Sequence, residues 1–191
     1  MFLESQIDSV IQKGSIEVIC GSMFSGKTEE LLRRLKRAEL AKLSIAVFKP
    51  KIDIRYNNEQ IVSHDSNKIK STSINSPSEI FQLSLNAKVI GIDEAQFFDP
   101  KLLDIALELA KKGKRVIIAG LDMDFLGNPF GIMPQLLSVA DHVTKVHAIC
   151  DECSDIANNS YRITNKEDLV EIGEKDKYLP LCRRCFSKKM Q

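Results

Sequence analysis

A glycine-rich loop at residues 21–28 constrains the fold of this chain more than any other feature. It reads Gly-Ser-Met-Phe-Ser-Gly-Lys-Thr. A short apolar segment at 15–20 precedes it, and leucines at 31, 32 and 35 follow it on one helical face. A strand, a glycine loop and a helix start in this order gather backbone N–H groups at the positive end of a helix dipole, where they bind anions. The pattern G-x-x-x-x-G-K-[ST] therefore predicts a P-loop that holds a nucleoside triphosphate.

The last two residues of this loop add chemistry to the anion cradle. Lys27 supplies a point charge for the phosphates, and Thr28 supplies a hydroxyl that can bind Mg²⁺. The predicted phosphate-binding residues are Gly21, Ser22, Met23, Phe24, Ser25, Gly26, Lys27 and Thr28.

Length and charge limit the classes of partner. The chain has 191 residues, of which 43% are apolar and 28% charged, as expected for one soluble domain with a small appendage. The 27 basic and 26 acidic residues leave a net charge of +1, which is too little to hold a nucleic-acid backbone. No apolar run is long enough to span a membrane, and residues 1–6 lack the features of a targeting signal. We expect a cytoplasmic protein without nucleic-acid or membrane partners.

Apolar segments alternate with amphipathic segments through the first three quarters of the chain. The predicted strands are 15–20, 44–49, 88–93, 115–119 and 142–147, and the predicted helices are 29–37, 78–85, 100–112 and 134–140. This alternation predicts an α/β fold with a P-loop core, in which helices flank a mostly parallel sheet. The polar stretch 51–77 is expected to be a long surface excursion.

Two adjacent carboxylates mark the end of the predicted strand 88–93. Asp93 lies at the carboxyl end of that strand, where it can hold Mg²⁺ beside the P-loop. Adjacent side chains at a strand end diverge, so Glu94 can face the γ-phosphate while Asp93 faces the metal. Glu94 is therefore the candidate general base. It would take a proton from a water in an ATPase or from a substrate hydroxyl in a kinase, and the alternative is that Glu94 only caps the following turn.

A kinase also needs a pocket for its second substrate, and apolar residues near the strand ends suit a flat ring. Met23, Phe97, Leu121 and Phe125 can line such a slot, although each can equally be an ordinary core residue. Asp53-Ile54-Arg55 follows the second strand. The Arg55 guanidinium can reach a transferring phosphoryl group, or it can form a simple surface ion pair.

The C-terminal segment carries two cysteine pairs. Cys150, Cys153, Cys182 and Cys185 form a C-x₂-C…C-x₂-C pattern, which is typical of a tetrahedral zinc site. Four protein ligands leave no open position for a catalytic water, so the zinc would be structural. We place a domain boundary near Ala148, with an ATP-binding domain at 1–148 and a zinc-binding domain at 149–191. The fifth cysteine, Cys20, is expected to be a buried strand residue.

The 28 residues between the cysteine pairs exceed the about 15–20 of a plain zinc ribbon. Metal would fix both ends of this segment, which makes it a tethered loop. Within it, residues 169–173 are strand-like, and Tyr178 follows a charged turn. A substrate lid and a nucleic-acid-binding finger both fit this arrangement, but the loop is not basic enough to favour the finger.

Four motifs together resemble the type II thymidine kinases. They are the loop at 21–28, Asp-Glu-Ala-Gln-Phe-Phe at 93–98, Gly-Leu-Asp-Met-Asp-Phe at 120–125, and Gly-x₂-Asp-x-Tyr-x-Pro-x-Cys-Arg-x-Cys-Phe at 173–186. The resemblance covers nearly the whole chain, and the last motif is specific to that family.

The resemblance implies a role for each matching residue. Glu94 would deprotonate the 5′-hydroxyl of thymidine. The residues implied for ATP and Mg²⁺ are those of the loop at 21–28 with Asp53, Arg55, Asp93 and Gln96. The residues implied around the thymine ring are Met23, Phe97, Leu121, Phe125 and Phe130, with a lasso loop formed by Leu169, Val170, Glu171, Ile172, Gly173 and Tyr178.

The resemblance also implies a structural Zn²⁺, a homotetramer, feedback inhibition by thymidine triphosphate and a role in salvaging a DNA precursor. Two other functions fit the motifs alone. An ATPase coupled to a partner would use Glu94 to activate water, and it would turn over ATP without a nucleoside. A zinc-containing nucleotide sensor would bind ATP without chemistry, but it would have no need of the Asp93–Glu94 pair.

Overall fold

The computed structural model describes residues 13–52, 60–62, 68–164 and 177–191. Its centre is a six-stranded sheet in the order β5-β2-β6-β7-β1-β8, in which every neighbouring pair is parallel. The strands are β1 (Ser15–Cys20), β2 (Ile45–Pro50), β5 (Thr72–Ile74), β6 (Val89–Ile92), β7 (Arg115–Gly120) and β8 (His142–Lys145). The predicted α/β fold with a mostly parallel sheet is confirmed.

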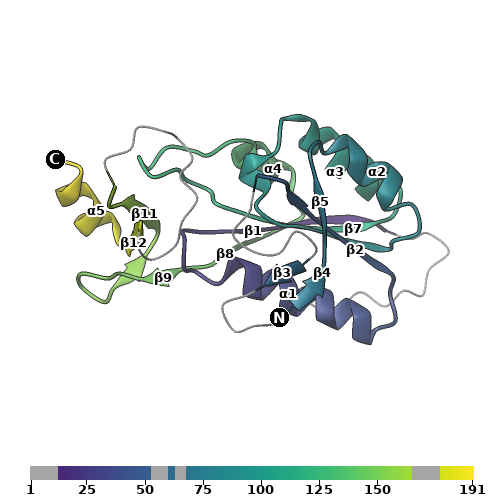
Figure 1. The fold of residues 1–191 in the computed structure, drawn as a ribbon, viewed down its shortest axis with the longest axis horizontal. Coiled ribbons are helices and arrows are strands. Elements are labelled where there is room, and N and C mark those ends of the chain that lie inside the picture. The colour runs from purple at the N-terminus through teal and green to yellow at the C-terminus, as the bar shows by residue number, and fades with distance from the viewer. Residues whose placement is uncertain (1–12, 53–59, 63–67, 165–176) are drawn as a thin grey trace.

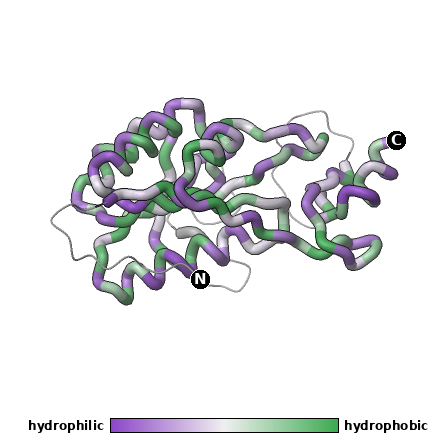
Figure 2. Tube along the Cα trace, turned by 180° about the vertical axis from the view of Figure 1, so that it is seen from behind, coloured by the Kyte–Doolittle hydropathy of each residue, from purple (hydrophilic) through white to green (hydrophobic). Residues whose placement is uncertain are grey.

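Helices cover both faces of this sheet (Figure 1). One face carries α1 (Lys27–Leu40), and the other carries α2 (Ser78–Leu83), α3 (Lys101–Lys111) and α4 (Met133–Val139). Neighbouring residues of a strand serve opposite faces: Ile117 of β7 packs on the α1 side, whereas Val116 and Ile118 pack on the other. The central strands are accordingly buried, near-continuously apolar segments (Figure 2).

The stretch 51–77 differs from the expected surface excursion. It contains the short antiparallel pair β3 (Gln60–Val62) and β4 (Lys68–Lys70), and then β5, which adds an edge strand beside β2. Ile74 is buried in the same apolar cluster as Phe48 and Ile80, which explains why a mostly polar segment returns to the sheet. The predicted strand 44–49 extends by one residue, because β2 includes Pro50.

The C-terminal part of the chain has its own small core. It consists of β9 (Ala148–Ile149), β10 (Ile156–Ala157), β11 (Asn159–Arg162), β12 (Tyr178–Leu181) and α5 (Arg183–Lys189), paired as β9–β10 and β11–β12. Its apolar cluster begins at Ala148 and includes Leu181 and Phe186. In Figure 1 this module projects from one end of the sheet.

A buried charge network ties α1 to the sheet. Glu17 of β1 accepts from Arg34 of α1 at 2.7 Å and from Arg115 of β7 at 2.6 Å. Arg34 also donates to Glu30 at 2.8 Å and to Thr144 of β8 at 2.8 Å, and its side chain is only 3% exposed. Removing Arg34 leaves Glu17 buried with Arg115 as its remaining cation among the described residues and removes the partner of Thr144, which is strongly destabilising.

We therefore predict that Arg34→Met lowers the free energy of unfolding by about 3–5 kcal/mol, measured by urea denaturation. The matched control is Arg33→Met, which removes an exposed partner of the same Glu30 and should cost no more than about 1 kcal/mol. Equal effects of the two substitutions would show that the buried network does not stabilise the fold.

Candidate active site

The P-loop joins β1 to α1 at the carboxyl edge of the sheet. Gly26 adopts φ 83° immediately before α1, a left-handed conformation that favours glycine. Gly21 is required for space, because an added Cβ would lie 2.2 Å from the carbonyl oxygen of Val146. The Lys27 ammonium and the Ser25 hydroxyl each donate to the Ser22 carbonyl at 2.7 Å. The Lys27 side chain therefore bends back onto the P-loop, whose phosphate-binding charge it is expected to supply.

Thr28 and Asp93 come together as the sequence predicted. The Thr28 hydroxyl donates to Asp93 Oδ2 at 3.2 Å, and the Glu94 N–H donates to Asp93 Oδ1 at 2.9 Å. Asp93 follows β6 and is buried. A hydroxyl and a carboxylate side by side are oxygen ligands of the kind that Mg²⁺ prefers.

Glu94 has a different set of contacts from Asp93. Its backbone is left-handed, with φ 52°, and it begins the short 3₁₀ helix η1 (Ala95–Phe97). The Gln96 side-chain amide donates to Glu94 Oε2 at 2.6 Å, and Gln96 Oε1 accepts from the Leu121 N–H at 2.9 Å. Backbone strain at a non-glycine residue is common at functional sites. Gln96, only 4% exposed, thus fixes the candidate base against the end of β7.

The aromatic residues expected around a flat ring lie on two neighbouring segments. Phe97 of η1 and Phe130 meet edge to face, with ring centroids 5.8 Å apart. Phe125 lies in the turn that leads from β7 to Phe130, which Asp124 holds by accepting from the Leu126 and Asn128 N–H groups at 2.9 Å each. Phe97, Leu121 and Phe125 are only partly buried, so they are not simple core residues.

The C-terminal module contacts the P-loop directly. The Met23 N–H donates to the hydroxyl of Ser160 in β11 at 2.9 Å, and Phe24 packs against the apolar cluster of the module. Arg162 of β11 donates to the Tyr178 hydroxyl and stacks over the Phe125 ring. Met23 and Phe125 thus both contact β11, and Tyr178 lies on its partner strand β12.

The four paired cysteines also come together. Their sulfur atoms lie within 4.8 Å of one another, and Cys153 Sγ is 3.6 Å from Cys182 Sγ. A tetrahedral Zn–S site with bonds of about 2.3 Å places its sulfurs about 3.8 Å apart, so the donor set fits a structural metal such as zinc. Cys182 also caps α5 by accepting from the Cys185 N–H at 3.4 Å.

Cys20 is buried in β1, as expected. Burial, together with the nearby Asp122 carboxylate, raises the pKa of the Cys20 thiol to about 11. The thiol is therefore protonated near neutral pH and suits packing rather than metal binding or nucleophilic attack.

Three polar features near the site escaped the sequence analysis. They are Ser160, Arg162 and an ion pair of 2.7 Å between Asp122 and Lys145. Asp122 lies within the motif at 120–125, so its place at a strand end was a usable signal. No sequence signal marks Ser160 or Arg162, because both lie in the segment that the sequence predicts to be a tethered loop.

Some predicted residues lie outside the described part of the chain. They are Asp53, Arg55 and the lasso residues Leu169, Val170, Glu171, Ile172 and Gly173. Within the described residues, no helix is both long and apolar enough to cross a membrane.

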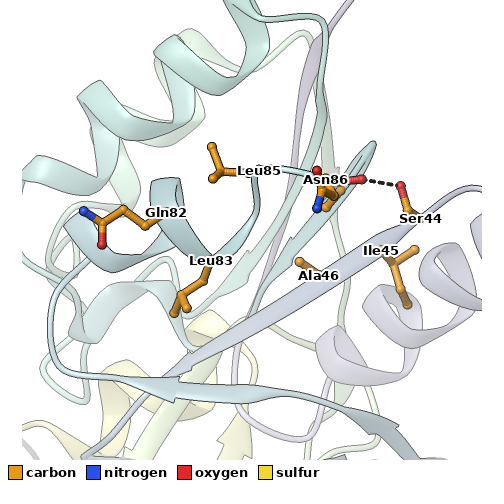
Figure 3. A pocket seen from close by; sticks show the side chains of 8 residues that line it. Ser44, Ile45, Ala46, Gln82, Leu83, Leu85 and Asn86 are labelled. Carbon is orange, nitrogen blue, oxygen red and sulfur yellow. Dashed lines mark hydrogen bonds between the residues drawn. The ribbon is translucent and has the colours of Figure 1, made fainter.

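A depression of about 270 Å³ lies at the amino end of β2, whereas the P-loop lies at the carboxyl ends of the strands. Figure 3 shows the side chains that line it. Its lining includes Ile45 at the start of β2, and Leu83 and Leu85 near the end of α2. Lys114 closes the neighbouring turn by donating to the carbonyls of Ser84, Leu85 and Ala87. Because parallel sheets bind ligands at the carboxyl ends of their strands, this depression is not the candidate site.

Known proteins of one family match this chain over nearly its whole length. The family model for thymidine kinase matches residues 14–186. A thymidine kinase of Bacteroides thetaiotaomicron is 55% identical over 97% of this chain and 94% of its own length. Those of Porphyromonas gingivalis and Bdellovibrio bacteriovorus are 54% and 51% identical, over 97% and 95% of this chain and 91% and 90% of their own lengths. With a P-loop, an adjacent carboxylate pair and a four-cysteine cluster in place, the chain belongs to the thymidine kinase family.

Proposed function

We propose that this protein transfers the γ-phosphoryl group of ATP to the 5′-hydroxyl of thymidine. The observation that carries the proposal is that Glu94 directly follows Asp93, the partner of Thr28, and that Gln96 ties its carboxylate to Leu121 at the end of β7. A base in that position can take the proton from a hydroxyl group that approaches the phosphates.

The P-loop residues would hold the phosphates of ATP. Backbone N–H groups at the start of α1 would face the anion, and Lys27 would leave the Ser22 carbonyl to reach the β- and γ-phosphates. Thr28 and Asp93 would hold Mg²⁺, which neutralises charge on the phosphates when bound. Asp53, Arg55 and Gln96 are proposed to complete the surroundings of the nucleotide.

Glu94 would act as the general base. The 5′-oxygen of thymidine forms a bond to the γ-phosphorus, the bond from that phosphorus to the bridging oxygen of ADP breaks, and the hydroxyl proton passes to Glu94. The amide of Gln96 orients the Glu94 carboxylate by donating to its Oε2 atom.

Apolar and aromatic residues would enclose the thymine ring. We assign Met23, Phe97, Leu121, Phe125, Phe130, Tyr178 and the segment 169–173 to this pocket. The edge-to-face pair of Phe97 and Phe130 and the contact of Met23 with Ser160 support the assignment, because they fix two sides of the pocket on different elements.

The four cysteines would hold Zn²⁺ as a structural ion. The separate apolar cluster that begins at Ala148 supports the division into an ATP-binding domain at 1–148 and a zinc-binding domain at 149–191. From the resemblance to type II thymidine kinases we further propose a cytoplasmic homotetramer that thymidine triphosphate inhibits.

An ATPase coupled to a partner remains the alternative. It uses the same P-loop and Glu94, but it needs no enclosure for a second substrate. The tethering of Phe125 and Tyr178 through Arg162 favours the kinase, since an ATPase has no use for a fixed aromatic pocket beside its base.

Replacement of Glu94 by Gln tests the base assignment. We predict that kcat for thymidine phosphorylation falls about 10²-fold or more, because the amide cannot accept the proton. ATP affinity, measured by fluorescence titration, should change little. The matched control is Glu108→Gln, an exposed carboxylate on α3, which should leave kcat unchanged. Near-normal turnover by E94Q would overturn the assignment.

Replacement of Cys153 by Ser tests the zinc site. Elemental analysis of the wild type should find one zinc per chain, and C153S should lose it. We expect C153S to have a higher KM for thymidine while its α/β core stays folded, because β11 and β12 contact the proposed pocket. The control Cys20→Ala should retain its zinc. A wild type purified without any zinc, after growth in zinc-replete medium, would remove the structural-metal proposal.

A further inference from the structure

Arg162 is a buried cation that the proposed reaction does not use. It ends β11 and lies opposite Tyr178 of β12 in the strand register. The residue is only 6% exposed. A guanidinium cannot lose its proton at physiological pH, so a buried arginine keeps its charge and must be held by its neighbours.

Two of these neighbours are aromatic residues assigned to the thymine pocket. Arg162 Nε and Nη2 donate to the Tyr178 hydroxyl at 3.2 and 3.0 Å. The guanidinium carbon lies 3.6 Å from the centroid of the Phe125 ring and 5.5 Å from that of Tyr178. One planar group therefore contacts a ring face and a hydroxyl at the same time.

The two aromatic residues come from different parts of the chain. Phe125 belongs to the turn after β7 of the α/β core, and Tyr178 begins β12 of the C-terminal module. Arg162 joins them across a distance of 53 residues in sequence, counted from 125 to 178. Their relative placement depends on this guanidinium as well as on the P-loop contact of Ser160 with Met23.

The chemistry of arginine explains why this residue suits the position. Its flat guanidinium stacks on an aromatic face while its edge donates hydrogen bonds. A lysine ammonium is a point charge and cannot perform both tasks in one plane. Stacking of this kind is strongest where water is excluded, as it is at Arg162.

We propose that Arg162 is a positioning residue that fixes Phe125 and Tyr178 as walls of the pocket for the nucleoside base. The inference rests on the proposed function and deepens it. Arg162 acts through its two aromatic neighbours and not on the phosphates. Its loss should therefore weaken the binding of thymidine and leave the handling of ATP intact.

The test compares the kinetics of Arg162→Met, Arg162→Lys and Tyr178→Phe with those of the wild-type holoenzyme. We expect R162M to raise the KM for thymidine about tenfold or more, with the KM for ATP within about twofold of wild type. R162K should restore little of the loss, because it returns the charge without the planar fork. Y178F should raise the KM for thymidine less than R162M does, since the stack on Phe125 remains.

The matched control is Lys189→Met. Lys189 is another cation near an aromatic ring of the same module, 5.5 Å from the centroid of Tyr161, but it is partly exposed and lies on α5. K189M should leave both KM values unchanged. Zinc content and thermal midpoint are measured for every variant, so that a loss of the fold is distinguished from a misplaced pocket.

Three outcomes overturn the inference. A normal KM for thymidine in R162M, full recovery in R162K, or an equal rise in the KM values for thymidine and ATP would each contradict a positioning role at the base. If R162M does not fold, R162K and Y178F decide the question by the same comparison. A wild type that makes no thymidine monophosphate would overturn the proposed function itself, whereas an active wild type with an unaffected R162M overturns only the inference about Arg162.

Discussion

Parallel strand pairing is the constraint on which the rest of this structure depends. Because β6, β7, β1 and β8 all run in one direction, their carboxyl ends meet at one edge of the sheet. That edge collects Asp93, Leu121, Gly21 and Val146, which are distant in sequence. Short contacts then complete the site: Thr28 bonds to Asp93, and Gln96 ties Glu94 to the end of β7. The buried Glu17–Arg34 pair holds α1, and hence the start of its helix dipole, against the same sheet.

The C-terminal module matters because it is joined to this edge at two points. Ser160 accepts from the P-loop at Met23, and Arg162 reaches the Phe125 turn. Both residues lie on β11, which pairs with β12 just before the second cysteine pair. A metal held by the four cysteines would thus fix the frame from which β11 and β12 extend. Under the proposed function, a metal in this small module would help to shape the substrate pocket.

The sequence allowed prediction of the parts of the site that rest on local patterns. The P-loop, the Asp93–Glu94 pair and the two C-x₂-C pairs are each recognised from residues close together in the chain, and the structure brings Thr28 beside Asp93 and the four cysteines together. The parallel sheet followed from the alternation of apolar and amphipathic segments. The return of β5 to the sheet was missed, because Ile74 is one apolar residue in a polar stretch. Ser160 and Arg162 were missed because their roles come from distant contacts. Ser160 contacts Met23, 137 residues away, and Arg162 contacts the Phe125 ring, and no local pattern encodes either contact.

The most direct measurement is the fate of the γ-phosphate of labelled ATP with Mg²⁺, in the presence and absence of thymidine. Chromatography separates thymidine monophosphate from free phosphate. The account predicts label in thymidine monophosphate when thymidine is present and almost no free phosphate when it is absent, because in the proposed mechanism Glu94 takes its proton from a sugar hydroxyl and not from water. Release of free phosphate at the same rate with and without thymidine would contradict the account and would indicate an ATPase.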